Sequence, residues 1–231
     1  MTVLTCSKLR KNYGRLLALD DVDISIEPGR IVGLLGPNGS GKSTFIKLAN
    51  GLLSPSAGEI RICGHIPGKE SRAMVSYLPE RASLPVWMSA KQLLDFYEDF
   101  YADFRRDAAE EMLEHLGIQQ SQRIKQMSKG TREKLQLIMV MSREAKLYLL
   151  DEPIGGVDPA TRDYILSTII SNYSPDASVI ISTHLIADVE KILDDVIFIN
   201  HGRIMMQASV DSIREEKGMS VDALFREVFK C

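Results

Sequence analysis

The stretch from Gly36 to Thr44 has the residue types and spacing of a phosphate-binding loop. Its letters, Gly-Pro-Asn-Gly-Ser-Gly-Lys-Ser-Thr, fit the pattern G-x-x-x-x-G-K-[ST]. An apolar run, Ile31 to Leu35, precedes it, and a helix-compatible stretch, Lys42 to Leu53, follows it. This order of strand, glycine-rich turn and helix is the setting in which the motif binds phosphate. The residues expected to bind a polyphosphate are Gly36, Pro37, Asn38, Gly39, Ser40, Gly41, Lys42, Ser43 and Thr44.

Each part of this loop has a chemical task. Glycines let the backbone curl until successive N–H groups point inward, and the start of the helix adds further donors and a positive dipole end. Lys42 is expected to reach the β- and γ-phosphates, and the Ser43 hydroxyl to ligate a bridging Mg²⁺. A glycine-rich turn that fits by chance is disfavoured, because the four fixed positions of the motif all match and stand between a strand and a helix.

Two carboxylates follow a second apolar run. Leu147 to Leu150 leads directly into Asp151, Glu152 and Pro153, which places both carboxylates at the sheet edge where the glycine-rich loop lies. Asp151 suits a magnesium ligand, directly or through water, and Glu152 suits a general base for an attacking water. The alternative is an Asp-Glu-Pro turn that caps the next helix, and the phosphate loop favours the catalytic interpretation.

The remaining elements predict an α/β fold. Val22 to Ile26 and Ile60 to Ile62 alternate apolar with polar residues, which predicts half-buried antiparallel strands near the N-terminus. Later runs are almost continuously apolar, as in strands buried on both faces of a parallel sheet. These runs are Met74 to Leu78, Leu147 to Leu150, Val179 to Ile181 and Val196 to Ile199. Helical patterns between them fall at Lys91 to Tyr101, Asp107 to Leu116, Thr131 to Glu144, Ala160 to Ser171 and Ile186 to Leu193.

Length and composition bound the domain organisation. With 231 residues, 45% of them hydrophobic, the chain should form a single domain, 1–231. A helical lobe at about 82–145 is expected as an insertion, and a tail at about 202–231 should form a short strand and helices. Within the lobe, an aromatic stripe that includes Tyr97 and Phe100 predicts lobe core or, alternatively, a docking face. The same two interpretations, lobe core and docking face, apply to Trp87.

The net charge of −3 gives no sign of a nucleic-acid surface. Three widely spaced cysteines, Cys6, Cys63 and Cys231, suit free thiols in a reducing compartment. Neither a leader nor an apolar run of the roughly eighteen residues needed to span a bilayer is evident. We therefore expect a soluble chain whose membrane role, if it has one, depends on a partner.

Two further segments complete a recognisable set: Ser128-Lys129-Gly130 opens a helix after the lobe, and Ser182-Thr183-His184 closes a later strand. With the phosphate loop and the Asp-Glu pair, the chain resembles the ATP-binding subunit of ABC transporters over about residues 3–206. The resemblance implies a P-loop NTPase of ABC ATPase type with ATP and Mg²⁺ as cofactors. It also implies a second ATPase subunit, an integral membrane transporter subunit, and a peripheral position on the cytoplasmic face of the cell membrane.

Several residue roles come from this resemblance. Tyr13 stands where an aromatic residue stacks on adenine, although a strand tyrosine packed on the sheet is the alternative. Glu80 stands where a residue lines the magnesium and the attacking water. His184 matches the switch histidine that contacts the γ-phosphate, whereas a lone histidine is more often structural.

The family signature is matched by Met127 to Thr131, whose Ser128 and Gly130 would contact the γ-phosphate held by the opposite subunit. Gly156-Val157-Asp158 resembles the loop that crosses the dimer interface. Lys129, Arg132 and Lys134 crowd the start of a helix, where an anion is expected unless the three cations are merely solvated. The sequence departs from the family at Glu80, usually Gln, and at Lys129 and Thr131, usually Gly and Gln.

The expected activity is Mg-dependent ATP hydrolysis by a nucleotide-sandwich dimer that powers a transporter. The short tail and the Tyr-Leu-Pro-Glu stretch resemble export-type subunits of bacteria. A soluble ABC ATPase acting on DNA or ribosomes is the main alternative, but neither fused cassettes nor long coiled-coil arms are seen. A phosphate-loop kinase would leave Ser128-Lys129-Gly130 and His184 unexplained, and a scaffold without turnover would be exposed by an ATPase assay.

Overall fold

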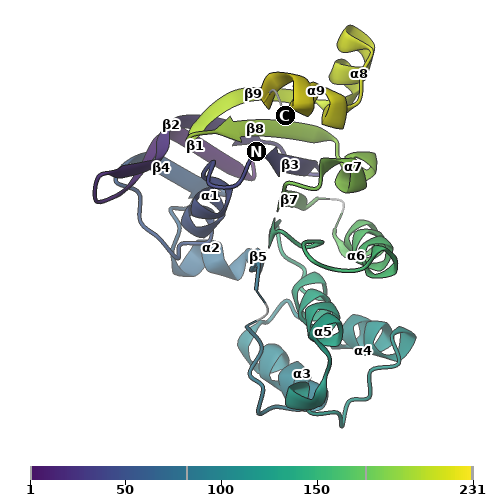
Figure 1. Cartoon of the computed structure of the whole chain (residues 1–231). Coiled ribbons are helices and arrows are strands. Elements are labelled where there is room, and N and C mark those ends of the chain that lie inside the picture. Colours follow the sequence, from purple (N-terminus) through teal and green to yellow (C-terminus); the bar gives the residue numbers. More distant parts are fainter. Residues whose placement is uncertain (1, 82, 175, 230–231) are drawn as a thin grey trace.

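A six-stranded, mostly parallel sheet forms the centre of the molecule (Figure 1). The computed structural model describes residues 2–81, 83–174 and 176–229. The strand order is β5-β6-β7-β3-β8-β9, and only β9 runs antiparallel to its neighbour. The bounds are β3 Ile31–Leu35, β5 Val75–Leu78, β6 Leu147–Asp151, β7 Ser178–Thr183, β8 Asp195–Asn200 and β9 Arg203–Ser209. The predicted parallel sheet is confirmed.

A second, antiparallel sheet has the order β2-β1-β4, with bounds β1 Leu4–Tyr13, β2 Leu16–Ile26 and β4 Ala57–Ile62. The predicted strands around Val22 and Ile60 are therefore confirmed, but β1 was missed. Register shifts interrupt its pairing with both neighbours, so its buried residues do not alternate regularly. An alternation pattern cannot detect such a strand, although β1 is the centre of its sheet.

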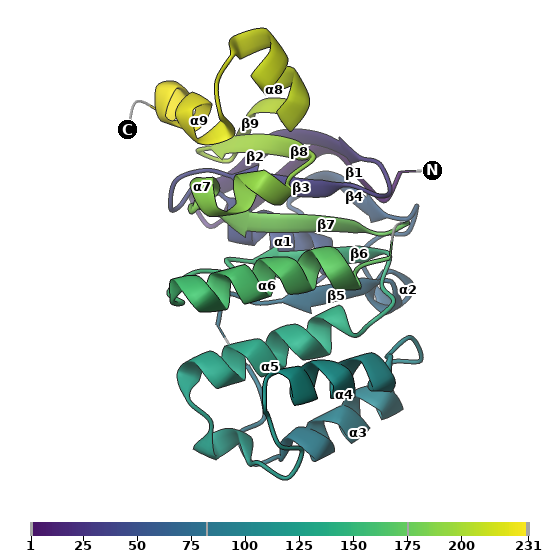
Figure 2. The same cartoon turned by 90° about the vertical axis from the view of Figure 1, so that its right-hand side faces the viewer.

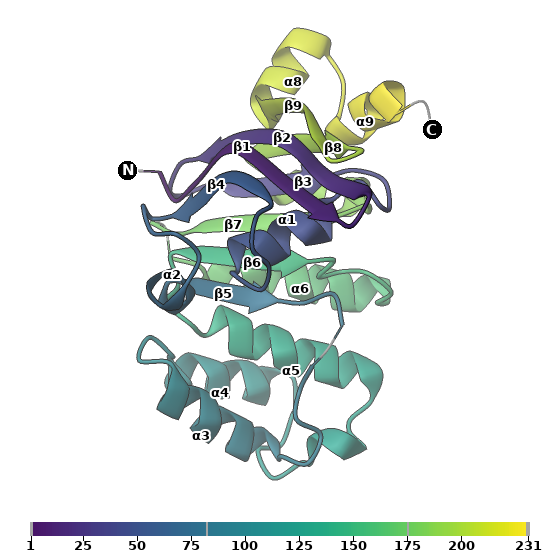
Figure 3. The same cartoon turned by 90° about the vertical axis from the view of Figure 1, so that its left-hand side faces the viewer.

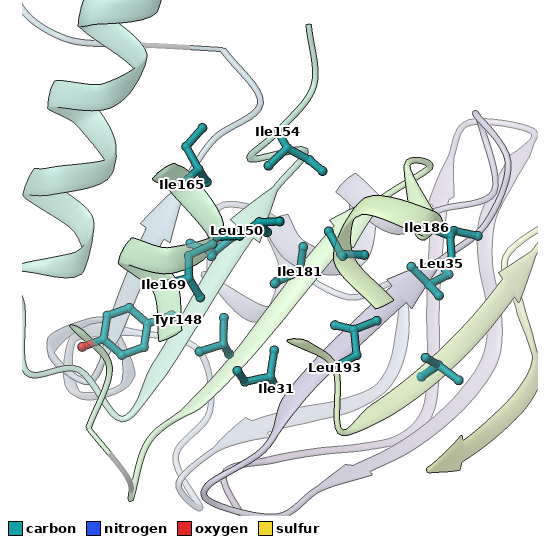
Figure 4. Packing of buried hydrophobic residues seen from close by; sticks show 14 of the residues in the cluster. Ile31, Leu35, Tyr148, Leu150, Ile154, Ile165, Ile169, Ile181, Ile186 and Leu193 are labelled. Carbon is teal, nitrogen blue, oxygen red and sulfur yellow. The ribbon is translucent and has the colours of Figure 1, made fainter. Parts of the chain in front are cut away.

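Helices cover both faces of the main sheet. On one face lie α1, Lys42–Ala49, and α2, Lys69–Ala73, a short helix that the sequence did not predict (Figure 3). On the other face lies α6, Pro159–Asn172, with α7, Ile186–Val189, and the 3-10 turn η2, Glu190–Ile192 (Figure 2). Figure 4 shows Ile165 and Ile169 of α6 beside Leu150 of β6 in the core. Burial on both faces explains why the central strands are almost wholly apolar.

The helical lobe contains α3 Ala90–Phe100, α4 Arg106–His115, the 3-10 turn η1 Ile124–Gln126 and α5 Lys129–Met141. It has its own buried cluster, against which Tyr97 and Phe104 pack. Phe100, by contrast, is 70% exposed, and Trp87 is 66% exposed. The aromatic stripe is thus divided between lobe core and surface, and it runs past the end of α3, since Phe104 follows the helix.

The C-terminal segment adds α8, Val210–Lys217, and α9, Val221–Phe229, which pack beyond β8 and β9 (Figure 1). Phe225 of α9 contacts Phe198 of β8 edge to face, with ring centroids 5.5 Å apart. The strand and the two helices predicted for the tail are present. Cys6 and Cys63 are free thiols, and Cys231 lies outside the described residues. Within the described ranges, no helix is long and apolar enough to cross a membrane.

Candidate functional site

The phosphate loop connects β3 to α1 and requires glycine at two tight positions. A side chain on Gly36 would overlap the Ile199 carbonyl oxygen of β8. Gly41 has φ +112°, and a Cβ there would lie 2.7 Å from the Ala18 carbonyl oxygen. Both glycines are therefore needed for the loop to sit between β2 and β8.

Lys42, the first residue of α1, is buried under this loop. Its Nζ donates to the carbonyl oxygens of Gly36 at 2.7 Å and Pro37 at 3.2 Å. Burial lowers the pKa of Lys42, whereas the nearby carboxylates of Glu152 and Asp151 oppose that shift. An anionic acceptor such as a phosphate would stabilise the Lys42 ammonium more than these two neutral carbonyls do, because hydrogen bonds between two charged groups are roughly twice as strong as neutral ones.

Ser43 and Asp151 meet directly beside the loop. The Ser43 hydroxyl donates to Asp151 Oδ1 at 3.2 Å, and the Ser182 hydroxyl donates to the same oxygen at 2.9 Å. Asp151 is buried, and this burial raises the pKa of its carboxyl, while the two hydroxyls act in the opposite direction. The pairing of β6 with β7 places Asp151 opposite Ser182, so the sheet register brings these groups together.

These oxygen ligands fit a magnesium ion that is shared with a polyphosphate. Mg²⁺ usually takes one or two carboxylates and completes its shell with phosphate and water. No group of three His, Cys, Asp or Glu residues that could hold a metal alone occurs in the described part of the chain. The Ser43–Asp151 pair therefore suits a metal that arrives with a phosphate ligand, and not a metal held by protein atoms alone.

Glu152 follows Asp151 with its backbone in the left-handed region, at φ +51°. Its Oε1 lies 3.0 Å from His184 Nδ1, and its Oε2 accepts from the Thr183 hydroxyl at 3.0 Å. Its backbone N–H donates to the Ser182 carbonyl oxygen at 2.8 Å. The end of β7 thus holds both the backbone and the carboxylate of Glu152. A strained residue of this kind often marks a functional site.

A cleft of about 550 Å³, hereafter the nucleotide cleft, joins these groups. Tyr13, which is 45% exposed, lies at its wall with the adjacent residues Leu16 to Ala18 of β2. Glu80, Glu152 and His184 also line it. From the phosphate loop it is lined by Asn38, Gly39, Ser40, Gly41, Lys42, Ser43 and Thr44. Gly36 and Pro37 instead contribute the carbonyls that hold Lys42, and Asp151 lies beneath Ser43.

Ser128 and Gly130 do not line the nucleotide cleft. Ser128 caps α5, where its hydroxyl accepts from the Thr131 N–H at 3.1 Å. Lys129 and Arg132 line a second cleft of about 600 Å³, together with Glu80, Glu152 and His184. The Lys129 side chain is 73% exposed, with Glu133 at 3.6 Å. Within one chain, the predicted signature is therefore separate from the phosphate loop.

Sequence reasoning missed some residues around this site. His201, in the turn between β8 and β9, lines the nucleotide cleft, but no local pattern pointed to it. Ser182 and Thr183 contact the two carboxylates, and the sequence analysis gave them no role. The carboxyl ends of parallel strands do meet at one edge of a sheet, but the pairing of Asp151 with Ser182 depends on the register between β6 and β7, which no local pattern contains.

Comparison with known proteins identifies the family. Residues 19–155 match a family described as ABC transporter. An uncharacterized ABC transporter ATP-binding protein, YxlF of Bacillus subtilis (strain 168), is 30% identical, over 96% of this chain and 76% of its own. The SkfA peptide export ATP-binding protein SkfE of the same strain is 29% identical, over 94% and 93%.

A solved structure agrees with these matches. The structure of an ATP binding subunit of an ABC transporter superposes with a TM-score of 0.89 at 28% identity, covering 98% of this chain and 99% of that one. The resemblance stated from the motifs and the predicted fold class are both confirmed. The chain therefore belongs to the ABC transporter family of ATP-binding ATPases.

Proposed function

We propose that this ATPase hydrolyses ATP with Mg²⁺ in a nucleotide-sandwich dimer. The observation that carries the proposal is the separation of two half-sites in one chain. The phosphate loop, Asp151 and Glu152 converge on the nucleotide cleft, whereas Ser128 and Gly130 lie at the start of α5 outside it. A second copy would bring its Ser128 and Gly130 over the nucleotide, so that approach of the two subunits would switch hydrolysis on.

In this site each residue has one task. Tyr13 stacks on adenine, the main-chain amides of the phosphate loop hold the phosphates, and Lys42 neutralises the β- and γ-phosphates. The residues that would hold magnesium are Ser43, Glu80 and Asp151. Bound magnesium would neutralise negative charge on the phosphate oxygens.

Two side chains act at the reacting phosphate. Glu152 orients the attacking water and accepts its proton, and His184 donates to the γ-phosphate. Phosphoryl transfer to water depends mainly on positioning and charge neutralisation, and these groups supply both.

The hydrolysis would drive transport through a separate integral membrane subunit, with the ATPase on the cytoplasmic face of the membrane. The similarity to SkfE, a peptide export ATP-binding protein, supports an export role. The absence of a membrane-spanning helix among the described residues fits a separate membrane subunit. We also propose that the whole chain works as a single domain with its helical lobe inserted, and we expect no nucleic-acid partner.

The test uses Glu152→Gln, which keeps the side-chain shape but removes the base. With ATP and Mg²⁺, this variant should bind nucleotide, keep only a small residual rate of turnover and form a dimer that light scattering detects after size-exclusion chromatography. Glu144→Gln, which neutralises an exposed carboxylate away from both clefts, is the control and should hydrolyse ATP at the parent rate.

Two results would contradict the proposal separately. Parent-rate hydrolysis by Glu152→Gln would show that the base is wrongly assigned. An ATP-loaded Glu152→Gln protein that stays monomeric would argue against the sandwich. Ser128→Arg in the same background should abolish the dimer while ATP binding to the monomer persists.

A further inference from the structure

The side chain of Thr183 ends β7 beside the proposed base. It is fully buried, and its hydroxyl donates to Glu152 Oε2 at 3.0 Å. The Thr183 hydroxyl oxygen itself accepts from the Leu185 backbone N–H at 3.0 Å. Thr183 therefore links the carboxylate of Glu152 to the backbone segment that carries His184.

The Leu185 contact fixes the direction of the Thr183 proton. A hydroxyl has one proton to donate. Because the Thr183 oxygen already accepts from Leu185, its proton points away from that N–H and toward the carboxylate. A β-branched side chain is also stiff at χ1, so the hydroxyl is held in place by both its rotamer and its acceptor contact.

The two oxygens of Glu152 are held by very different groups. His184 contacts Oε1, but its side chain is 48% exposed, so it can turn toward a nucleotide. Thr183 contacts Oε2 from the buried end of a central strand and has no such freedom. The left-handed backbone of Glu152 is itself a strained conformation, which makes side-chain support from β7 more important for its orientation.

We propose that Thr183 is a positioning residue that keeps the Glu152 carboxylate aimed at the attacking water while His184 engages the phosphate. The inference rests on the proposed role of Glu152 as the base. A misplacement of about 1 Å in an active site can cost on the order of a hundredfold in rate. Loss of the hydroxyl should therefore slow the chemical step without weakening ATP binding.

The experiment compares Thr183→Val, which has nearly the same shape, with Thr183→Ser, which keeps the hydroxyl. We expect Thr183→Val to lower kcat by about ten- to a hundredfold, with KM and the Kd for ATP within about twofold of the parent. Thr183→Ser should recover most of the lost rate. Thr168→Val, at a buried threonine of α6, is the control for removing a buried hydroxyl and should keep the parent kcat.

Stability must be separated from positioning, because Thr183→Val also leaves the Leu185 N–H without its acceptor. Thermal unfolding of each variant gives that control, and Thr183→Ala, which leaves room beside the carboxylate, replaces the valine variant if the latter does not fold. Parent kcat in a folded Thr183→Val or Thr183→Ala protein would overturn the proposal. An equal loss in Thr183→Ser would do the same, because the hydroxyl would then not be the cause.

Combination with Glu152→Gln distinguishes the two proposals. If Thr183 acts through the carboxylate, Thr183→Val should not reduce the residual rate of Glu152→Gln further. A full additional loss would mean that Thr183 acts elsewhere. If Glu152→Gln itself hydrolyses ATP at the parent rate, the assigned base fails. If Glu152→Gln is inactive and Thr183→Val is fully active, only the role of Thr183 fails.

Discussion

His184 Nδ1 lies 3.0 Å from Glu152 Oε1, at the wall of the nucleotide cleft. The Glu152 side chain is mostly buried, at 13% exposure, while that of His184 is half exposed. One ring nitrogen thus contacts the carboxylate, and the other, Nε2, is the atom with which the same ring could reach a phosphate. The pair connects the proposed base to the proposed phosphate contact through a single side chain.

Replacement of His184 should mainly affect the rate of hydrolysis. We expect His184→Ala to lower kcat by about a hundredfold, since removal of one preorganised hydrogen-bond donor has an effect of that order. Steady-state phosphate release with saturating Mg²⁺ and ATP measures it. His65→Ala, at an exposed histidine in the turn after β4, serves as control. Parent kcat in His184→Ala would place the histidine outside the reaction.

Replacement of Glu80 tests whether ATP hydrolysis requires a third carboxylate near the proposed metal site. Glu80 lines the nucleotide cleft, and its charge is among those that raise the pKa of Asp151, after burial. We expect Glu80→Gln to retain measurable ATPase activity, because an amide oxygen can still contact a metal or a water. The magnesium concentration for half-maximal activity should rise, because one anionic ligand is lost.

A magnesium titration of the ATPase rate measures this change, with Glu144→Gln as the matched control. Complete loss of turnover in Glu80→Gln would mean that the carboxylate itself is required. An unchanged magnesium dependence would show that Glu80 does not act at the metal.

Some residues of the site could be predicted from the sequence, and others could not. The phosphate loop and the Asp151–Glu152 pair are local patterns, so residue type and spacing were enough. The contacts of Ser182 and Thr183 with these carboxylates depend on the register between β6 and β7, which no local pattern contains. His201 is brought to the nucleotide cleft by the turn between β8 and β9, far along the chain from the loop that it faces.

The elements of the fold likewise differ in how well the sequence predicts them. Buried parallel strands were predicted because burial on both faces makes them continuously apolar. Strand β1 was not, since its register shifts break the alternation. The aromatic stripe of α3 could not be assigned to one face either, because a periodic pattern does not say which neighbours cover it, and Phe100 proved exposed while Tyr97 packs on the lobe core.

Tyr13 should control nucleotide affinity but not base selectivity. Its ring is partly exposed at the nucleotide cleft, and stacking of a base on an aromatic ring contributes roughly 1 to 3 kcal/mol while tolerating any base. Tyr13→Ala should therefore weaken ATP and GTP binding alike, by about five- to a hundredfold, and Tyr13→Phe should bind both as the parent does. Fluorescent-nucleotide titration measures these constants. Unchanged binding in Tyr13→Ala would contradict the stacking role.

Arg143 should be among the side chains whose loss most destabilises the junction of lobe and sheet. Only 4% of its side chain is exposed, and it donates to both oxygens of Asp103 and to the carbonyls of Ala73 and Val75. Its guanidinium also lies 3.9 Å from the ring centre of Tyr101. Arg143 therefore joins the loop between α3 and α4 to the edge strand β5.

Removal of Arg143 would leave a carboxylate and two carbonyls without this donor. We expect Arg143→Met to lower the free energy of unfolding by about 3 to 5 kcal/mol, as for other broken buried ion pairs. Arg106 offers a matched control, because its partners Asp95, Glu98 and Glu110 are 40 to 52% exposed. Arg106→Met should cost about 1 kcal/mol or less. Urea denaturation of both variants measures the difference, and equal losses would show that burial does not decide the contribution of these arginines.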